Sequence, residues 1–140
     1  MFCGIITGEL AASRVYEDEH VVAFMDVRPL TPGHLLVVPR THAASLEVLA
    51  EDLGTRMFAV AHQLARALRN SAVPSEGVNF FLADGVAAGQ EVFHVHLHVI
   101  PRTPGDGFRL KARPHTPERG ELDATAERVR AGMSTLPHRA

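Results

Sequence analysis

The sequence predicts an α+β fold, in which an antiparallel five-stranded sheet has helices packed on one side. Five short segments are rich in apolar and β-branched residues, which favour strands. One long segment between the third and fourth of these has apolar residues every three or four positions, which is typical of an amphipathic helix. The connection between the last two strand segments is of hairpin length, which favours antiparallel pairing.

The first half of the chain carries three of the expected strands. Its apolar segments are short. They are separated by acidic or Pro-containing stretches, which are typical of turns and loops. The expected elements, in order, are one helical turn at 2–6, strands at 13–16 and 21–26 joined by the acidic turn 17–19, a loop at 27–34, and a strand at 35–38.

The second half begins with a helical region. Met57, Val60, Leu64 and Leu68 recur every three or four residues and predict one buried helical face, and Pro74 helps to end the region. The expected elements, in order, are helices at 44–49 and 52–70, strands at 77–83 and 91–100 joined by a loop at 84–90, a loop at 101–117, and a last helix at 121–133.

Composition excludes several classes of protein. The chain has 140 residues, 46% hydrophobic and 21% charged, which is ordinary for a single globular domain. A net charge of −2 provides no basic field for a nucleic acid, and no apolar run approaches the ~20 residues of a membrane helix. Cys3 is the only cysteine, which excludes an intrachain disulfide and indicates a reducing compartment. With no signal peptide visible, we expect a soluble, cytoplasmic protein that binds neither nucleic acid nor membrane.

Three histidines stand at alternate positions of the last expected strand, His94, His96 and His98. Because side chains alternate along a strand, the three imidazoles are predicted to share one face, about 6.5–7 Å apart. The apolar residues between them are predicted to face the long helix. Three imidazoles on one face are costly to desolvate without a shared purpose, so this face is the candidate site.

Two kinds of chemistry fit such a histidine face. Imidazole is the commonest metal ligand, and three histidines can bind zinc. Alternatively, a neutral imidazole can attack phosphorus, a second can stay cationic to balance phosphoryl charge, and a third can orient the nucleophile. Gly85 and Gly89 in the preceding loop allow backbone N–H groups to turn toward an anion, which favours phosphoryl chemistry over a metal site.

These segments resemble the histidine-triad family, most closely its bacterial members near the Hint branch. The resemblance runs from about Phe2 to about Phe108 and is continuous. It is carried by YEDEHVVAFMDVRPLTPGHLLVVPRTH at 16–42, GVN at 77–79, GQEVF at 89–93, HVHLHVI at 94–100 and PR at 101–102. It implies a HIT-like fold for a histidine-triad domain at 1–108, with 109–140 as a C-terminal extension of the same domain. It also implies a homodimeric nucleotide-binding hydrolase.

The resemblance implies roles for the three histidines. His96 occupies the nucleophile position, His98 binds the α-phosphate or assists the leaving group, and His94 holds the geometry of the triad. A histidine at the third position resembles the hydrolases of the family, whereas its nucleotidyltransferases usually have Gln there. The implied substrate-binding residues are Asp26 for the ribose, Phe24 and Val27 for the base, His34 beside the triad, Asn79 at a family asparagine position, and Gln90, Glu91 and Val92 near the phosphate.

Three positions depart from the family pattern. Glu91 stands where the Hint branch commonly has Ser or Thr, and Ala83 stands where an Asn or Gln donor is usual. Relatives with structural zinc use a C-x-x-C pair plus histidines, whereas Cys3 and His42 alone are too few for a tetrahedral site. We therefore expect no metal, and the implied reaction needs no cofactor.

The sequence thus predicts a hydrolase that cleaves a purine nucleoside monophosphate conjugate at its α-phosphate through a nucleotidyl-histidine intermediate. The conjugate is a phosphoramidate or a dinucleotide polyphosphate. Two alternatives remain open, a nucleotide-binding regulatory module with little catalysis and a three-histidine metalloenzyme. The remaining histidines are expected to be exposed, namely His20, His62, His115 and His138.

Overall fold

The structure is a computed structural model of the chain, and its description covers residues 1–137. His138 therefore lies outside the described residues. The chain divides into two compact units, Met1–Phe108 and Arg109–Ala140, and each is described by itself. No helix of the described residues is long and apolar enough to cross a membrane.

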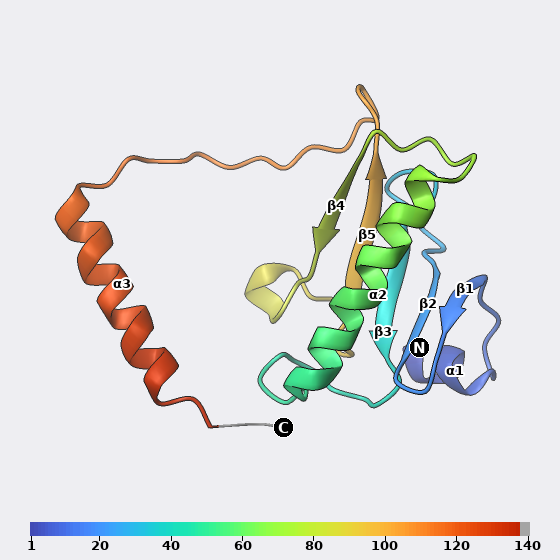
Figure 1. Cartoon of the computed structure of the whole chain (residues 1–140), viewed down its shortest axis with the longest axis horizontal. Helices are drawn as coiled ribbons and strands as arrows, with labels where there is room; N and C mark the ends of the chain where they lie inside the picture. Colours follow the sequence, from blue (N-terminus) through green and yellow to red (C-terminus); the bar gives the residue numbers. More distant parts are fainter. Residues whose placement is uncertain (138–140) are drawn as a thin grey trace. The chain divides into compact units, whose positions relative to one another are not determined.

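The first unit is a five-stranded antiparallel sheet in the order β1-β2-β3-β5-β4, as Figure 1 shows. The predicted fold class is confirmed. Its elements are α1 (Phe2–Thr7), β1 (Arg14–Glu17), β2 (Val21–Met25), β3 (Leu35–Pro39), α2 (Glu51–Arg69), β4 (Gly77–Phe81), the 3-10 turn η1 (Val86–Ala88) and β5 (Leu97–Arg102).

Each face of the sheet has its own hydrophobic core. Alternate residues of β2 and β3, such as Val21 and Leu35, pack with Met57 and Val60 of α2 on one face. The residues between them, such as Phe24, pack on the other face with α1. The expectation that helices cover only one side of the sheet is therefore wrong, because α1 buries Phe2 and Ile5 against the second face.

The expected helix at 44–49 is also wrong, because these residues form only a hydrogen-bonded turn. Ser45 O accepts from the N–H groups of Val48 and Leu49, and no longer run of helical bonds develops. The N–H of Leu46 binds the side chain of Asp84 instead, at 3.0 Å. The leucines in this stretch therefore do not belong to a helix of their own, although Leu49 is buried in the core beside α2.

The last strand is shorter at its start than expected and longer at its end. β5 begins at Leu97, so the expected strand at 91–100 is wrong over residues 91–96. Pro39, at the end of β3, has no N–H to offer a further ladder bond, and the N–H of Val95 binds Ala43 O at 2.8 Å instead. At the other end, Arg102 pairs with Gly77 of β4, so the first two residues of the expected loop at 101–117 belong to the strand.

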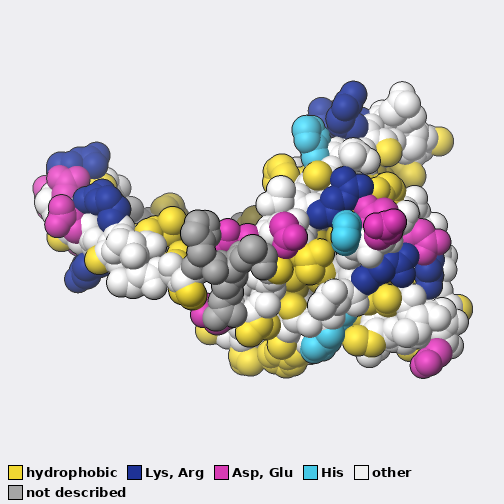
Figure 2. Space-filling model, turned by 60° about the horizontal axis from the view of Figure 1, so that its bottom comes forward, with side chains coloured by type: hydrophobic (Ala, Val, Ile, Leu, Met, Phe, Trp, Pro, Cys, Tyr) yellow, Lys and Arg dark blue, Asp and Glu magenta, His cyan; other side chains and the backbone are white. Residues whose placement is uncertain are grey.

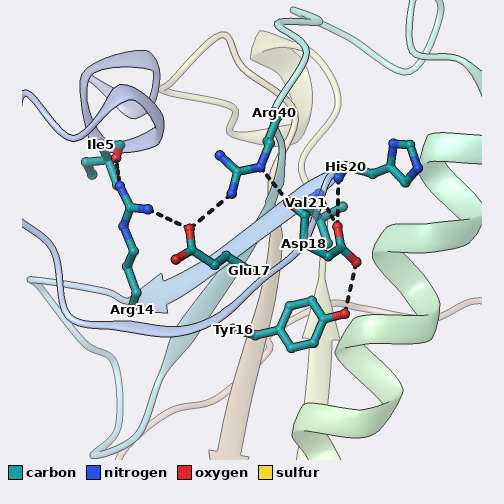
Figure 3. A network of polar contacts seen from close by, with 8 residues as sticks. All are labelled: Ile5, Arg14, Tyr16, Glu17, Asp18, His20, Val21 and Arg40. Carbon is teal, nitrogen blue, oxygen red and sulfur yellow. Dashed lines mark hydrogen bonds and ion pairs between the residues drawn. The ribbon is translucent and has the colours of Figure 1, made fainter.

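A polar network fastens the β1–β2 turn (Figure 3). Asp18 accepts hydrogen bonds from the backbone N–H groups of His20 and Val21 and from the Tyr16 hydroxyl. Arg56 of α2 donates to the same carboxylate at 2.8 and 2.6 Å. Burial alone would raise the pKa of Asp18, but these donors outweigh it and hold the pKa well below its usual range. The turn and α2 are thereby joined on the face of the sheet that α2 covers.

Between residues 109 and 137 the second unit contains one helix, α3 (Arg119–Ser134), which has no buried residues. Charges of both signs lie along it, and Arg119–Asp123 and Arg130–Glu127 form exposed ion pairs. On the face of the molecule in Figure 2, basic and acidic side chains lie near one another rather than in separate fields. His20, His62 and His115 are exposed, as expected.

Candidate functional site

A cavity of about 420 Å³ lies on the α1 face of the first unit. One row of paired residues crosses four strands beneath it: Phe24 of β2 pairs with Leu36 of β3, Leu36 with His98 of β5, and His98 with Phe81 of β4. All four residues line the cavity. The volume falls in the usual range for small-molecule sites. The sheet register therefore places His98 between Leu36 and Phe81, with Phe24 one strand beyond Leu36.

His96 lies beside His98 in this cavity, with their ring centroids 5.0 Å apart. Its Nδ1 is 2.8 Å from the backbone carbonyl of His94, and a carbonyl can only accept, so Nδ1 carries the proton. The Nε2 lone pair of the neutral ring is then free. Phe2 packs edge-on against the ring at 5.1 Å and helps to hold it. The sequence did not single out Phe2, whose only signal was its place in an apolar segment.

His34 determines which nitrogen of His98 carries a proton. The N–H of Leu30 donates to Nδ1 of His34 at 3.0 Å, so a neutral His34 carries its proton on Nε2. That Nε2–H donates to Nδ1 of His98 at 2.8 Å. His98 therefore carries its own proton on Nε2. His34 is 1% exposed, so the surrounding residues hold its ring in this orientation.

Burial keeps both of these rings neutral. It lowers the pKa of His34, and it lowers the pKa of His98 to about 4, with charge on His96 and on His34 acting in the same direction. The general expectation that a second triad histidine stays cationic is therefore not met by His98 near pH 7. A neutral His98 can still donate a hydrogen bond through Nε2–H.

Asp26 follows β2 at the same cavity. One of its carboxylate oxygens accepts the backbone N–H of Arg28 at 2.8 Å, and the other lies 3.6 Å from Nε2 of His34. Asp26, His34 and His98 thus form one cluster, with one atom of each lying within 4.8 Å of the others. The side chain of Asp26 remains partly exposed, which leaves acceptor capacity for a ligand hydroxyl.

His94 does not share the face of the other two histidines. Its Nε2 donates to Pro39 O at 2.8 Å, and its ring does not line the cavity. The predicted common face is wrong at this residue because strict alternation holds only inside a strand, and His94 precedes β5 by three residues. The rings of His96 and His98 are also closer than the predicted spacing. His94 still supports His96, but through its backbone carbonyl.

The ring of His94 instead meets Cys3 and His42. Its Nδ1 is 3.7 Å from Cys3 Sγ and 3.2 Å from His42 Nδ1, and Sγ lies 3.7 Å from His42 Nδ1. Tetrahedral zinc, with bonds of about 2.0–2.1 Å to nitrogen and 2.3 Å to sulfur, separates its ligands by about 3.3–3.6 Å. Burial lowers the pKa of His94, and its proton lies on Nε2, so Nδ1 presents a lone pair.

These three residues fit three corners of a zinc site, and no fourth donor joins them within the described part of the chain. From the sequence only Cys3 and His42 are expected at such a site, because His94 is expected on the triad face. The expectation of no structural metal stays a prediction. No comparable cluster unites His94, His96 and His98 among the described residues, so the structure gives no support to a three-histidine metal centre.

The cavity brings together most of the other residues predicted for the site. Its lining includes Phe24, Asp26, Val27, Glu91, Val92, His96 and His98, and His34 lies directly behind His98. The lining also includes Arg28, which the sequence reading missed although it follows the predicted Asp26 and Val27.

Gln90 and Asn79 do not line the cavity. The Gln90 side chain is buried and fully bonded to backbone: Oε1 accepts from Gly85, and Nε2 donates to Ala44 O and Val92 O. It therefore holds the 84–92 segment in place. Asn79 accepts a hydrogen bond from Arg102 at 2.6 Å, which links the paired strands β4 and β5.

Comparison with known proteins identifies the family of the chain. The HIT domain matches residues 7–105 of the chain, a region that contains all five strands. An uncharacterised HIT-like protein of Borreliella burgdorferi is 46% identical over 113 residues, covering 79% of this chain and 81% of that protein.

Solved structures share the fold. A zinc-bound histidine triad family protein from Mycobacterium smegmatis is 39% identical, with a TM-score of 0.75 and coverage of 94% of this chain and 95% of that one. A histidine triad nucleotide-binding protein from Candida albicans is 26% identical, with a TM-score of 0.86 and coverage of 97% and 98%. The chain therefore belongs to the HIT family of nucleotide-binding proteins and hydrolases.

Proposed function

We propose that the protein hydrolyses conjugates of purine nucleoside monophosphates at the α-phosphorus through a nucleotidyl-His96 intermediate. The observation that carries this proposal is the hydrogen bond from Nδ1–H of His96 to the His94 carbonyl, which leaves Nε2 as a free lone pair. His96 lines the cavity beside His98. A lone pair on an oriented imidazole is a nucleophile that needs no cofactor.

The proposed reaction has two steps. In the first, Nε2 of His96 forms a bond to phosphorus while the bond from phosphorus to the leaving group breaks. Nε2–H of His98 donates a hydrogen bond to a phosphoryl oxygen, and the leaving group takes its proton from solvent. In the second, water attacks phosphorus, its proton passes to solvent, and the bond from phosphorus to His96 breaks. Nε2 of His96 is again a free lone pair, His98 keeps its proton throughout, and the nucleotide is released.

Residues at the β2 end of the cavity fit the nucleoside. Phe24 forms part of an apolar wall suited to a base, and Val27 is 86% exposed at its edge. Asp26 can accept from the two ribose hydroxyls through its partly exposed carboxylate. Near the other end, Gly89 has φ of 88°, a left-handed conformation that favours glycine. The loop at 84–90 can thereby bring its backbone N–H groups close to a phosphate.

The experiment compares His96→Ala with His62→Ala, a matched change of an exposed histidine on α2. With an adenosine 5′-phosphoramidate as substrate, His96→Ala is expected to lose turnover by about 10³-fold or more, as removal of a nucleophile usually does. Nucleotide binding, measured by calorimetry, is expected to survive, and His62→Ala should behave like wild type. Unchanged turnover in His96→Ala would reject the mechanism.

The same assay separates the regulatory-module alternative. That alternative predicts tight nucleotide binding with wild-type turnover no higher than the His96→Ala background. A mass increase of one nucleotidyl group on His96, trapped by rapid acid quench, would support the hydrolase instead.

We also propose that the protein acts as a homodimer in the cytoplasm. β4 lies at the edge of the sheet, where unpaired backbone groups and exposed aromatic side chains favour association. Phe80 and Phe81 on β4 are 36% and 41% exposed, and Phe58 of α2 packs edge-on against Phe80. Sedimentation should show a dimer that Phe80→Glu converts to a monomer, and a monomeric wild type would contradict this proposal.

The proposed cytoplasmic location is supported by the single cysteine, because a chain without disulfides suits a reducing compartment.

A further inference from the structure

Glu91 is the feature of the cavity that the proposed reaction does not use. It is an exposed carboxylate that lines the cavity together with His96 and His98. Within residues 1–137 it has no hydrogen-bond or ion-pair partner. A bare carboxylate is an unusual neighbour for a phosphate, because like charges repel.

The backbone that carries Glu91 is fixed. Gln90 N–H donates to Gly85 O at 3.1 Å, and Gly85 N–H donates to Gln90 Oε1 at 2.8 Å, which closes the loop upon itself. The Gln90 amide then donates to Ala44 O at 2.8 Å and to Val92 O at 3.1 Å. These bonds hold both neighbours of Glu91 in the chain. The carboxylate can rotate, but it cannot leave the cavity wall without breaking this arrangement.

Glu91 and Asp26 reach the cavity from different segments. Asp26 follows β2, whereas the loop that leads to Glu91 follows β4, and Gln90 binds the end of that loop to Ala44 beyond β3. His96 and His98 line the same cavity. If the ribose binds at Asp26 and the phosphorus at His96, the space on the loop side remains for the leaving group.

The charges of the lining do not suit a polyanion. Its charged side chains are Asp26, Arg28 and Glu91, and His98 is neutral near pH 7 because its pKa is about 4. Arg28 is the single basic side chain of the lining, and it follows Asp26 at the β2 end. Ala83, beside the loop, offers no side-chain donor. The N-terminal ammonium of Met1 also belongs to the lining, so the described residues place a carboxylate but no basic side chain beside the loop.

We propose that Glu91 selects substrates by the charge of the leaving group. It favours leaving groups that carry an ammonium and disfavours those that carry carboxylate or phosphate, such as the second nucleotide of a dinucleotide polyphosphate. This inference rests on the proposed function and names the substrate class of the same site. One unit charge at about 6–8 Å in a solvated cavity changes kcat/KM by about three- to tenfold.

The test uses three adenosine 5′-phosphoramidates with amine tails of equal length that end in ammonium, methyl or carboxylate. The kcat/KM of wild type is expected to fall in that order, by about tenfold or more from the ammonium substrate to the carboxylate substrate. Glu91→Gln keeps the shape of the side chain and removes its charge, so the three kcat/KM values should converge. Diadenosine tetraphosphate should be a poor substrate of wild type and improve about three- to tenfold in Glu91→Gln.

The matched control is Glu19→Gln, because Glu19 is exposed and does not line the cavity. It should retain the wild-type order of substrates. Adding 0.5 M salt should reduce the differences in kcat/KM among the three substrates of wild type, because salt screens the charge of Glu91. If all three phosphoramidates are turned over and Glu91→Gln leaves their order unchanged, the role of Glu91 is rejected while the proposed function stands. If none is turned over by wild type, the proposed function itself fails.

Discussion

Nε2–H of His34 donates to Nδ1 of His98 across 2.8 Å, joining two residues that are 64 positions apart in the sequence. The N–H of Leu30 determines the direction of this bond, because it occupies Nδ1 of His34. A buried residue outside the H-x-H-x-H segment therefore sets the proton position on a cavity histidine. His34 acts on the proposed reaction through His98, so it is a positioning residue.

Removing this bond should impair turnover more than binding. In His34→Leu the Nδ1 of His98 loses its donor, both tautomers become accessible, and kcat is expected to fall about 10- to 100-fold with little change in KM. His34→Gln keeps an N–H donor and should recover part of the loss. Steady-state kinetics and nitrogen NMR of the imidazoles check this, and an unchanged tautomer of His98 in His34→Leu would contradict it.

Zinc should bind the Cys3–His42–His94 cluster without being a permanent part of the structure. Three ligands with tetrahedral spacing attract the ion, but a structural zinc site usually has four. Protein purified without added metal is expected to contain little zinc, and added zinc should bind at one site per chain and be removed by EDTA. Calorimetry should show weaker binding in Cys3→Ser. A stoichiometric zinc that survives EDTA would overturn the expectation of no structural metal.

Acid should destabilise the fold as the pH falls from about 6.5 toward 4. Burial lowers the pKa of His34, His94 and His98 from the ordinary histidine value of 6.5, and lowers that of His98 to about 4. In this window the unfolded chain binds more protons than the folded one, so stability is lost as the pH decreases.

For His98, which is partly exposed, the loss is on the order of 1–2 kcal/mol after solvent screening is allowed for. Urea unfolding at a series of pH values measures it. His98→Asn should flatten the pH dependence in this window, and His62→Asn should leave it intact. A wild-type stability that stays level from pH 6.5 to 4 would count against these lowered pKa values.

The Asp18 network should matter for stability and not for chemistry, because it lies on the α2 side of the fold. Asp18→Ala removes the acceptor for two backbone N–H groups of the turn and for Arg56. The loss of these hydrogen bonds is expected to lower Tm by about 4–8 °C, as the loss of a side-chain cap does. Arg56→Ala should lower Tm less, since the backbone bonds of Asp18 remain. Arg69→Ala, an exposed change on the same helix, is the control for thermal unfolding. Loss of activity in folded Asp18→Ala would show that the network reaches the site.

Much of the fold could be predicted because its signals are local. The apolar period from Met57 to Leu68 predicted α2, and short β-branched runs predicted the strands, since period and composition depend on neighbouring residues alone. Local signals fail where a distant partner determines the structure. Residues 91–96 have strand composition, but the N–H of Val95 binds Ala43 O, outside the ladder between β3 and β5.

The family, the identity of the histidines and most of the elements that carry them follow from residue order and local preference. Which ring nitrogens carry protons, and which way each ring turns, depends on the folded chain. Those outcomes depend on single hydrogen bonds between residues far apart in the chain, such as His94 with Pro39. A spacing of two residues therefore predicted three imidazoles on one face, whereas long-range contacts place His96 and His98 at the cavity and His94 beside Cys3 and His42.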